Sequence, residues 1–227
     1  MKKGFSPYKF GRIFHLVIGL ISISFESKNE HNLVMFYSCL PFVLPCSVCC
    51  MNVKRTLTEI GFEKFHPDSL KKALLFSNNF HNHISSDLKK NIHFTYKQHL
   101  YAHHTIATGN EIGVTFDQED HNTDYRLLPT TDRTTIKFSN YDAIITYLMA
   151  FTIYNYQKKN RQYYEIFFLS LKRLIPTFKF SLNLSSVSKL KHSFFNQQQK
   201  WKYFSHMEKE MEHLREANKL ICNLNFF

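Results

Sequence analysis

Apolar residues recur along most of this chain every three or four positions, which is the spacing of a helix face. The pattern predicts helices at about 8–25, 31–43, 46–61, 68–90 and 93–105, and again at about 140–157, 161–175 and 187–222. Pro45 separates the second helix from the third, and Pro67-Asp68-Ser69 is a typical start for the fourth. The sequence therefore predicts an all-α fold.

The pattern changes between His103 and Thr135. This segment contains two glycines, a proline, several acidic residues and five threonines between Thr123 and Thr135, which is typical of loops or short extended segments. We therefore predict two regions. Residues 1–105 form a compact bundle of four to five helices, and residues 106–227 form a second, mainly helical region.

Composition supports a folded, helical protein. Of the 227 residues, 44% are hydrophobic and 21% are charged, which excludes a disordered chain. Only 6 glycines and 6 prolines are present, which favours helices over a turn-rich all-β fold. Five cysteines are too few for a disulfide-stapled miniprotein.

Two apolar stretches raise the question of export or membrane insertion. Basic residues precede the run from Leu16 to Phe25, which is the outline of a signal peptide, but the run is short, follows His15 and lacks a clean cleavage site. The stretch 33–50 contains Pro41 and Pro45, which suit a buried helix and a turn better than a membrane span. We expect a soluble protein with no membrane span.

The net charge of +11 raises the question of nucleic acid. The lysines are scattered along the chain, and no recognised nucleic-acid motif accompanies them. Aromatic and basic residues alternate at 154–168, which could form a stacking platform, although a solvated helix face is the simpler interpretation. We expect no specific nucleic-acid partner.

The segment LPCSVCC holds the most specific chemistry. Cys46 and Cys49 form a Cys-x-x-Cys pair at a predicted helix start, with Cys50 beside it. Thiols at i and i+3 of a first helical turn share one face, and a helix N-terminus favours the thiolate of the first. This arrangement suits a redox-cycling disulfide. The alternatives are inert cysteines and half of a zinc site, completed by His81 with His83 or by His99 with His103 and His104.

Two further sequence motifs flank this cysteine pair, one before it and one after it. Phe14-His15 lies upstream of Cys46, and FSNNFHNHISSDLKK follows at 76–90. With these motifs the chain resembles the Erv/ALR family of FAD-linked sulfhydryl oxidases over about residues 8–92. That family carries W-x-x-L-H on a first helix, then Cys-x-x-Cys, then W-x-x-x-x-H-N-x-V-N-x-x-L-G-K. His15, His81 and Asn82 match the family pattern, as do Ile84, Leu88 and Lys90.

The chain departs from the family pattern at several positions. Phe76 replaces one tryptophan, Gly11 stands where the other is expected, Ser85 replaces the second asparagine and Lys89 the glycine. No cysteine lies between Cys50 and Cys222, so the family's further structural disulfide has no counterpart. Such divergence, together with the extended C-terminal region, is most similar to the oxidases of large insect DNA viruses of the baculovirus type.

The resemblance implies an FAD-dependent thiol oxidase with a specific set of site residues. Cys46 and Cys49 would be the catalytic pair, and electrons would pass from Cys49 through FAD to oxygen, giving peroxide. The implied cofactor-binding residues are His15, Phe76, His81, Asn82, Ser85 and Lys90. No metal is expected.

The resemblance also implies partners and a location. The substrates would be dithiol proteins, with a role in viral protein maturation, in the host nucleus or cytoplasm and in the virion. Family members are commonly homodimers, so we expect a homodimer here. We interpret the apolar residues spaced along Met207–Ile221 as part of the intramolecular core and not as the dimer interface. We interpret Cys39 and Cys222 as free or buried thiols and not as a shuttle pair. The alternative function is a basic helical binding protein, for nucleic acid or a protein partner, with structural zinc or inert cysteines.

Overall fold

The computed structural model describes residues 7–90, 93–108, 148, 152 and 157–175. Its helices are α1 (Pro7–Ile23), α2 (Glu30–Val43), α3 (Ser47–Glu59), α4 (Leu70–Asp87), α5 (Tyr96–Thr108) and α7 (Arg161–Leu174). Three 3₁₀ turns accompany them, at Ser27–Asn29, Phe62–Lys64 and Lys158–Asn160. The described residues contain no strand, so the all-α prediction is confirmed. The predicted helices at 140–157 and 187–222 fall almost wholly outside these residues.

Local sequence signals explain where the helices begin and end. Ser69 caps α4 by accepting a hydrogen bond from the Lys72 backbone N–H at 3.4 Å. Leu44, which precedes Pro45, is extended at φ −66° and ψ 148°, as a residue before proline prefers, and α2 ends at Val43. Gly61 has φ +73° after the end of α3, in the left-handed region where glycine carries no steric cost. Pro41 is accommodated in the last turn of α2.

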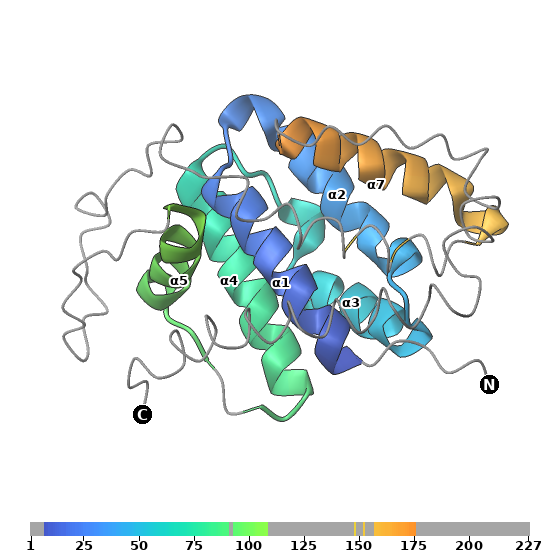
Figure 1. Cartoon of the computed structure of the whole chain (residues 1–227), viewed down its shortest axis with the longest axis horizontal. Helices are drawn as coiled ribbons and strands as arrows, with labels where there is room; N and C mark the ends of the chain where they lie inside the picture. Colours follow the sequence, from blue (N-terminus) through green and yellow to red (C-terminus); the bar gives the residue numbers. More distant parts are fainter. Residues whose placement is uncertain (1–6, 91–92, 109–147, 149–151, 153–156, 176–227) are drawn as a thin grey trace, which may run out of the picture.

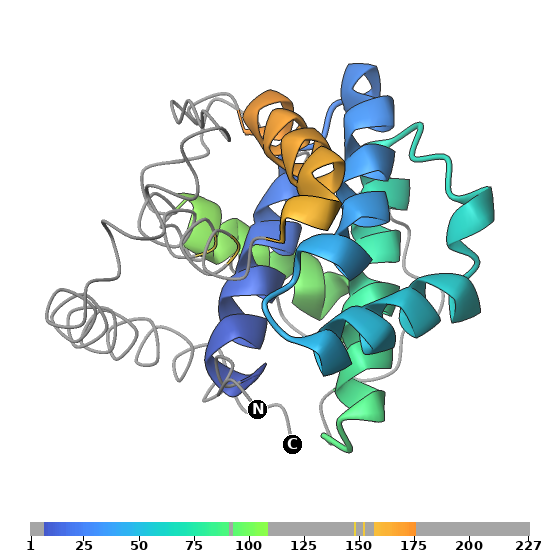
Figure 2. The same cartoon turned by 90° about the vertical axis from the view of Figure 1, so that its right-hand side faces the viewer.

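The helices form a bundle with α1 inside it. One side of α1 packs against α4 and α5, while α2 packs against α3 and α7, and α3 also contacts α4 (Figures 1 and 2). Burial of α1 is nearly continuous from Leu16 to Ser24. The bundle therefore surrounds its first helix, and side chains on α1 can meet residues from both α4 and α5.

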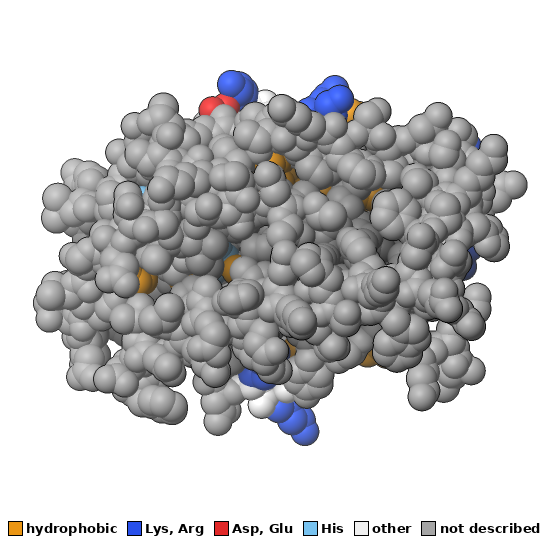
Figure 3. Space-filling view, viewed as in Figure 1, with side chains coloured by type: hydrophobic (Ala, Val, Ile, Leu, Met, Phe, Trp, Pro, Cys, Tyr) orange, Lys and Arg blue, Asp and Glu red, His pale blue; other side chains and the backbone are white. Residues whose placement is uncertain are grey.

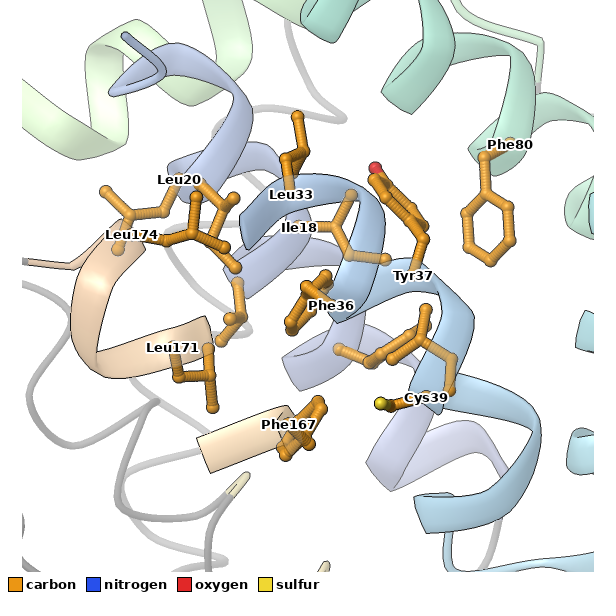
Figure 4. Close-up of a cluster of buried hydrophobic side chains, with 14 of the residues drawn as sticks. Ile18, Leu20, Leu33, Phe36, Tyr37, Cys39, Phe80, Phe167, Leu171 and Leu174 are labelled. Carbon is orange, nitrogen blue, oxygen red and sulfur yellow. The ribbon is translucent and has the colours of Figure 1, made fainter. Parts of the chain in front are cut away.

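Large aromatic side chains fill the centre of the bundle. Phe36 of α2 stacks on Phe167 of α7, with ring centroids 5.3 Å apart, and Tyr37 contacts Phe80 of α4 at 5.6 Å (Figure 4). All four side chains are buried. Removing such side chains from water is the main source of stability in a helical bundle.

Helix α7, from the second predicted region, packs on the first. Its start lies near the end of α2, where the Asn160 side chain donates a hydrogen bond to the Phe42 carbonyl at 3.1 Å. Its end lies near the start of α2, where Arg173 donates to the Asn32 side-chain oxygen. The two helices are therefore antiparallel. The predicted boundary near residue 105 thus falls between segments that share one hydrophobic core.

Two properties of the helices and the surface concern binding to a membrane or to a nucleic acid. Within the described part of the chain, each helix is too short or too polar to cross a lipid bilayer. Figure 3 shows described Lys and Arg side chains at separate places along the rim of one face. On this face the described basic residues do not gather into one patch.

Candidate active site

The two thiols of the Cys-x-x-Cys pair lie in the first turn of α3. Cys46 is the N-cap, with extended backbone, and its sulfur accepts a hydrogen bond from the Cys49 backbone N–H at 3.1 Å. A thiol replaces the usual serine or aspartate oxygen at this position. The cap therefore holds the Cys46 sulfur against the positive end of the helix, beside Cys49.

The thiols of Cys49 and Cys50, which lie next to Cys46, are partly shielded from water. Burial raises the pKa of Cys49 well above its ordinary value, and a hydrogen bond with the Cys46 side chain raises it further. Burial likewise raises the pKa of Cys50 to about 11, and its thiol donates a hydrogen bond to the Leu44 carbonyl. Cys49 and Cys50 are therefore neutral thiols at neutral pH, and Cys46 is the sulfur that accepts hydrogen bonds.

The remaining cysteines lie apart from this turn or outside the described residues. Cys39 is 1% exposed in the core beneath α7, and burial raises its pKa to about 12 (Figure 4). All four described cysteines are free thiols. Cys222 lies outside the described residues, so a pairing with Cys39 stays untested, although Cys39 is inaccessible to a partner protein.

His15 and His81 meet although they are far apart in the sequence. His15 lies on α1 and His81 on α4, and their rings contact edge to face with centroids 4.5 Å apart. Both residues are half-buried, but the Nδ1 atom of each is inaccessible and has no hydrogen-bond partner in the described part of the chain. Buried polar atoms without a partner are uncommon in folded proteins, and a functional role or a bound water or ion is among their explanations.

Two histidines of α5 lie next to the His15–His81 pair. His99 lies 6.2 Å from His81 and 4.5 Å from His103, measured between ring centroids. A hydrogen bond of 2.9 Å joins His99 Nε2 to the Ser77 hydroxyl. The ring of His103 occupies the space beside Gly19 of α1, where a Cβ atom would lie 1.9 Å from it. We call His15, His81, His99 and His103 the histidine cluster.

Burial keeps the histidine cluster neutral. It lowers the pKa of His81 to about 4 and that of His103 to about 3, and it lowers those of His15 and His99 well below the ordinary value. The charges of other cluster members lower the pKa values of His15, His99 and His103 further. For His81, a hydrogen bond with Asn82 partly offsets the effect of burial, and the charge of Lys90 lowers the pKa, as it does for His15. At neutral pH the cluster therefore offers neutral rings, which can donate and accept hydrogen bonds or stack.

From the sequence alone, His99 and His103 are candidates only as zinc ligands. Their spacing of four residues on a predicted helix is the signal that places them on one face. Among the described residues, no group of three or more His, Cys, Asp or Glu side chains is arranged to hold a metal ion. His83 lies away from the cluster, since its Nε2 contacts the Glu59 carboxylate of α3 at 2.6 Å.

Asn82, Ser85 and Lys90 shape the end of α4. The Asn82 side chain donates to the Phe94 carbonyl and accepts from the Phe94 N–H, both at 2.8 Å, which ties α4 to the segment before α5. Ser85 is buried, and its carbonyl accepts the Lys90 N–H at 3.0 Å. Lys90 is exposed and close enough to influence His15 and His81. The structure thus brings these three to the edge of the histidine cluster.

Phe76 is not brought to the cluster. Its ring stacks on Phe65 with centroids 3.8 Å apart and contacts Tyr37 at 4.9 Å. Tyr37 in turn contacts Phe80, and Phe80 contacts His15, so two aromatic rings separate Phe76 from His15. Phe76 instead lines an open hollow of about 410 Å³ with Lys64, Phe65, His66, Lys72, Leu75 and Asn79.

Comparison with known proteins identifies no relative of this chain. No family model, curated protein or solved structure matches it.

Proposed function

We propose that this protein is an FAD-dependent sulfhydryl oxidase that forms disulfide bonds in other proteins. The observation that carries the proposal is the Cys46 cap of α3, whose sulfur accepts a hydrogen bond from the Cys49 N–H. It gives the chain two thiols in one helical turn, at the positive end of a helix, as a redox-cycling pair requires. The contact between the His15 and His81 rings supports the proposal that the protein binds FAD.

The thiol chemistry proceeds through Cys46. In the oxidised enzyme, a substrate thiolate attacks the Cys46 sulfur of a Cys46–Cys49 disulfide, and Cys49 leaves and takes up a proton. The second substrate thiolate then attacks the substrate sulfur of this mixed disulfide, and Cys46 leaves as a thiolate. The helix N-terminus stabilises that leaving group. The substrate loses two electrons and two protons, and the Cys46/Cys49 pair gains the electrons.

The residues around the histidine cluster fit a bound flavin nucleotide. The Nδ1 atoms of His15 and His81 are buried and without partners, and Lys90 supplies positive charge for an anionic diphosphate. When bound, FAD supplies a two-electron acceptor that reduces oxygen to hydrogen peroxide. The overall reaction converts a dithiol and oxygen into a disulfide and peroxide, which balances.

The other implied cofactor residues take different roles in this proposal. Asn82 is a positioning residue, because both ends of its amide are engaged by Phe94 and a direct ligand contact would compete with them. Ser85 holds the turn that carries Lys90. Phe76 supports the aromatic core behind the cluster and acts through Tyr37 and Phe80.

A spectrum and an oxygen electrode test the proposal together. The purified protein, or the protein reconstituted with FAD, is expected to show a flavin absorbance band at about 450 nm and to consume oxygen with dithiothreitol. Peroxide should appear in proportion to the oxygen consumed. A protein that stays colourless after reconstitution and consumes no oxygen would refute the function.

Assembly and biological setting belong to the same proposal. We infer a homodimer that oxidises dithiol proteins during viral protein maturation, from the family resemblance and the extended, basic chain. Light scattering of the purified protein measures the mass directly. A mass equal to the 27.0 kDa chain at all concentrations would exclude the dimer.

A further inference from the structure

We propose that α7 clamps the segment that carries the thiol pair. In this proposal Asn160 and Tyr163 are positioning residues that hold Phe42 and thereby keep the Cys46 sulfur against the start of α3. We call Asn160 and Tyr163 the α7 clamp. The functional meaning of the clamp rests on the proposed oxidase, in which Cys46 is the thiol that reacts with the substrate. The clamp gives α7, a helix from the second predicted region, a role in that reaction.

The last turn of α2 is weakly held by its own hydrogen bonds. Pro41 lies inside α2 and has no N–H group, so the hydrogen bond that this position would donate to the Tyr37 carbonyl is missing. The Leu44 N–H reaches the Leu40 carbonyl at 3.3 Å, which is long for a helix. The Phe42 carbonyl belongs to the last turn, where carbonyls have no donor within the helix. This turn therefore depends on contacts from outside α2.

The α7 clamp supplies such contacts. Asn160 is the N-cap of α7, where an asparagine side chain commonly caps its own helix, but here it instead donates a hydrogen bond to the Phe42 carbonyl at 3.1 Å. The Tyr163 ring lies nearly parallel to the Phe42 ring, with centroids 3.8 Å apart and an interplanar angle of 8°. Both contacts reach Phe42 where α7 runs beside α2 (Figures 1 and 2). The clamp thus holds the backbone and the side chain of the same residue.

The clamped residue is directly connected to the thiol pair. Three consecutive residues, all of them buried, separate Phe42 from Cys46. Leu44, in the middle of these three, also accepts the hydrogen bond of the Cys50 thiol at 3.6 Å through its carbonyl. The ring of Pro45 fixes its φ angle, which leaves the connection little freedom. A displacement of Phe42 is therefore passed on to Cys46, the cap of α3.

The pH dependence of Cys46 alkylation tests the inference in the reduced full chain. Iodoacetamide reacts with the thiolate, and peptide mass spectrometry reads Cys46 separately from the other cysteines. The helix N-terminus favours the Cys46 thiolate only while the sulfur is held against it. In Asn160→Ala/Tyr163→Ala we therefore expect the midpoint of the pH profile to rise by about 0.5 pH unit, which makes alkylation below the midpoint about threefold slower.

Two single variants keep the test independent of folding. Asn160→Ser retains a good N-cap for α7, but its side chain is too short for the Phe42 carbonyl, so it should raise the midpoint without loss of stability. Tyr163→Phe retains the ring that stacks on Phe42 and should keep the wild-type profile. An unchanged midpoint in the double variant, or in Asn160→Ser if the double variant does not fold, would overturn the clamp.

Leu171→Ala is the matched control for a general loss of stability. Leu171 is 0% exposed and lies two turns beyond Tyr163 on α7, so its removal weakens the packing of α7 on the core but spares the clamp. It should lower the midpoint of urea unfolding and leave the Cys46 profile unchanged. A rise in the pH midpoint as large as that of the double variant would contradict a positioning role.

This measurement needs neither flavin nor oxygen, so its outcome is separate from that of the oxidase proposal. A raised midpoint in the clamp variants of a protein that stays colourless and consumes no oxygen would support the clamp and refute the oxidase. An active oxidase whose Cys46 profile is the same in the wild type and the double variant would refute the clamp alone.

Discussion

The thiol pair and the histidine cluster are built in opposite ways. Cys46 and Cys49 belong to one helical turn, and the geometry of that turn brings their sulfur atoms together. The histidine cluster takes one residue from α1, one from α4 and two from α5, and only packing brings them together. Local structure therefore determines the reactive thiols, whereas tertiary structure determines the site that would receive the electrons.

The two sites also differ in their access to solvent. The thiol pair lies beside exposed residues at the start of α3, where a protein partner can reach it. His99 and His103 are buried, and the whole cluster is kept neutral. Changes at the thiol pair should therefore affect turnover with little effect on folding, and changes within the cluster should affect stability first.

The largest expected effect comes from Cys49→Ser. The Cys46/Cys49 disulfide cannot form, so oxygen consumption with dithiothreitol should fall at least about 100-fold, on the scale of removing a catalytic nucleophile. Bound flavin should be retained and the unfolding midpoint should change little, because serine is close in size to cysteine and Cys49 is only partly buried. Cys50→Ser is the matched control and should retain turnover. Equal losses in both variants would contradict the assignment of the pair.

The next largest effect is on the free energy of unfolding. Gly19→Ala places a Cβ atom 1.9 Å from the His103 ring, so the buried ring or α5 itself must shift. We expect a loss of about 3 kcal/mol in urea unfolding, at the upper end of overpacking. Gly11→Ala on the same helix meets no atom within 4 Å and should stabilise the protein by about 0.5–1 kcal/mol. Equal effects of the two substitutions would contradict the packing of His103 on α1.

Acid should destabilise the protein through the cluster. Burial lowers the pKa of His103 to about 3 from an ordinary value of 6.5, so below pH 6.5 the unfolded chain binds a proton that the folded chain does not. The stability that is present above pH 6.5 is lost as the pH falls toward 3. His103 alone should cost about 2 kcal/mol between pH 7.5 and pH 5.

Urea unfolding at the two pH values, for the wild type and for His103→Gln, measures this contribution. The variant should show a smaller drop, because glutamine does not titrate. An identical pH dependence in both proteins would mean that His103 has the same pKa in the folded and unfolded states, which would contradict its burial as a neutral ring.

The smallest predicted effect concerns the edge of the cluster. Asn82→Ala removes both side-chain hydrogen bonds to the Phe94 backbone and leaves partly buried backbone groups without these partners, so we expect a loss of about 1–2 kcal/mol. Flavin affinity should fall as well, if Asn82 positions the segment before α5. Asn79→Ala, at an exposed site on the same helix, is the control and should change stability by less than about 0.5 kcal/mol. Equal losses would show that the link to Phe94 does not hold α5.

The helices themselves were predictable because their signals are local. Apolar spacing predicted helices at 31–43, 46–61 and 68–90, and the structure has them at Glu30–Val43, Ser47–Glu59 and Leu70–Asp87. The ends differ by a few residues because caps such as Cys46 and Ser69 lie outside the helix they begin. Amphipathic spacing at 161–175 likewise predicted α7, but nothing in it indicated that α7 packs on α2.

The candidate site was predictable only in part. Spacing singled out Cys46, Cys49, His15 and His81, but the roles of Asn82 and Phe76 depend on their contacts. An amide that matches a ligand-binding pattern in sequence is indistinguishable from one that binds the backbone of Phe94. An aromatic ring that matches the same pattern can face Phe65 and Tyr37 instead.

By itself, the sequence determined the all-α class, the positions of the helices and the thiol pair in the first turn of α3, because these depend on contacts within about four residues. Only the tertiary structure decided that His99 and His103 join His15 and His81, and that α7 shares the core. The physical reason is that helix periodicity specifies which residues share a face, while the partner of each face depends on how all the helices pack together.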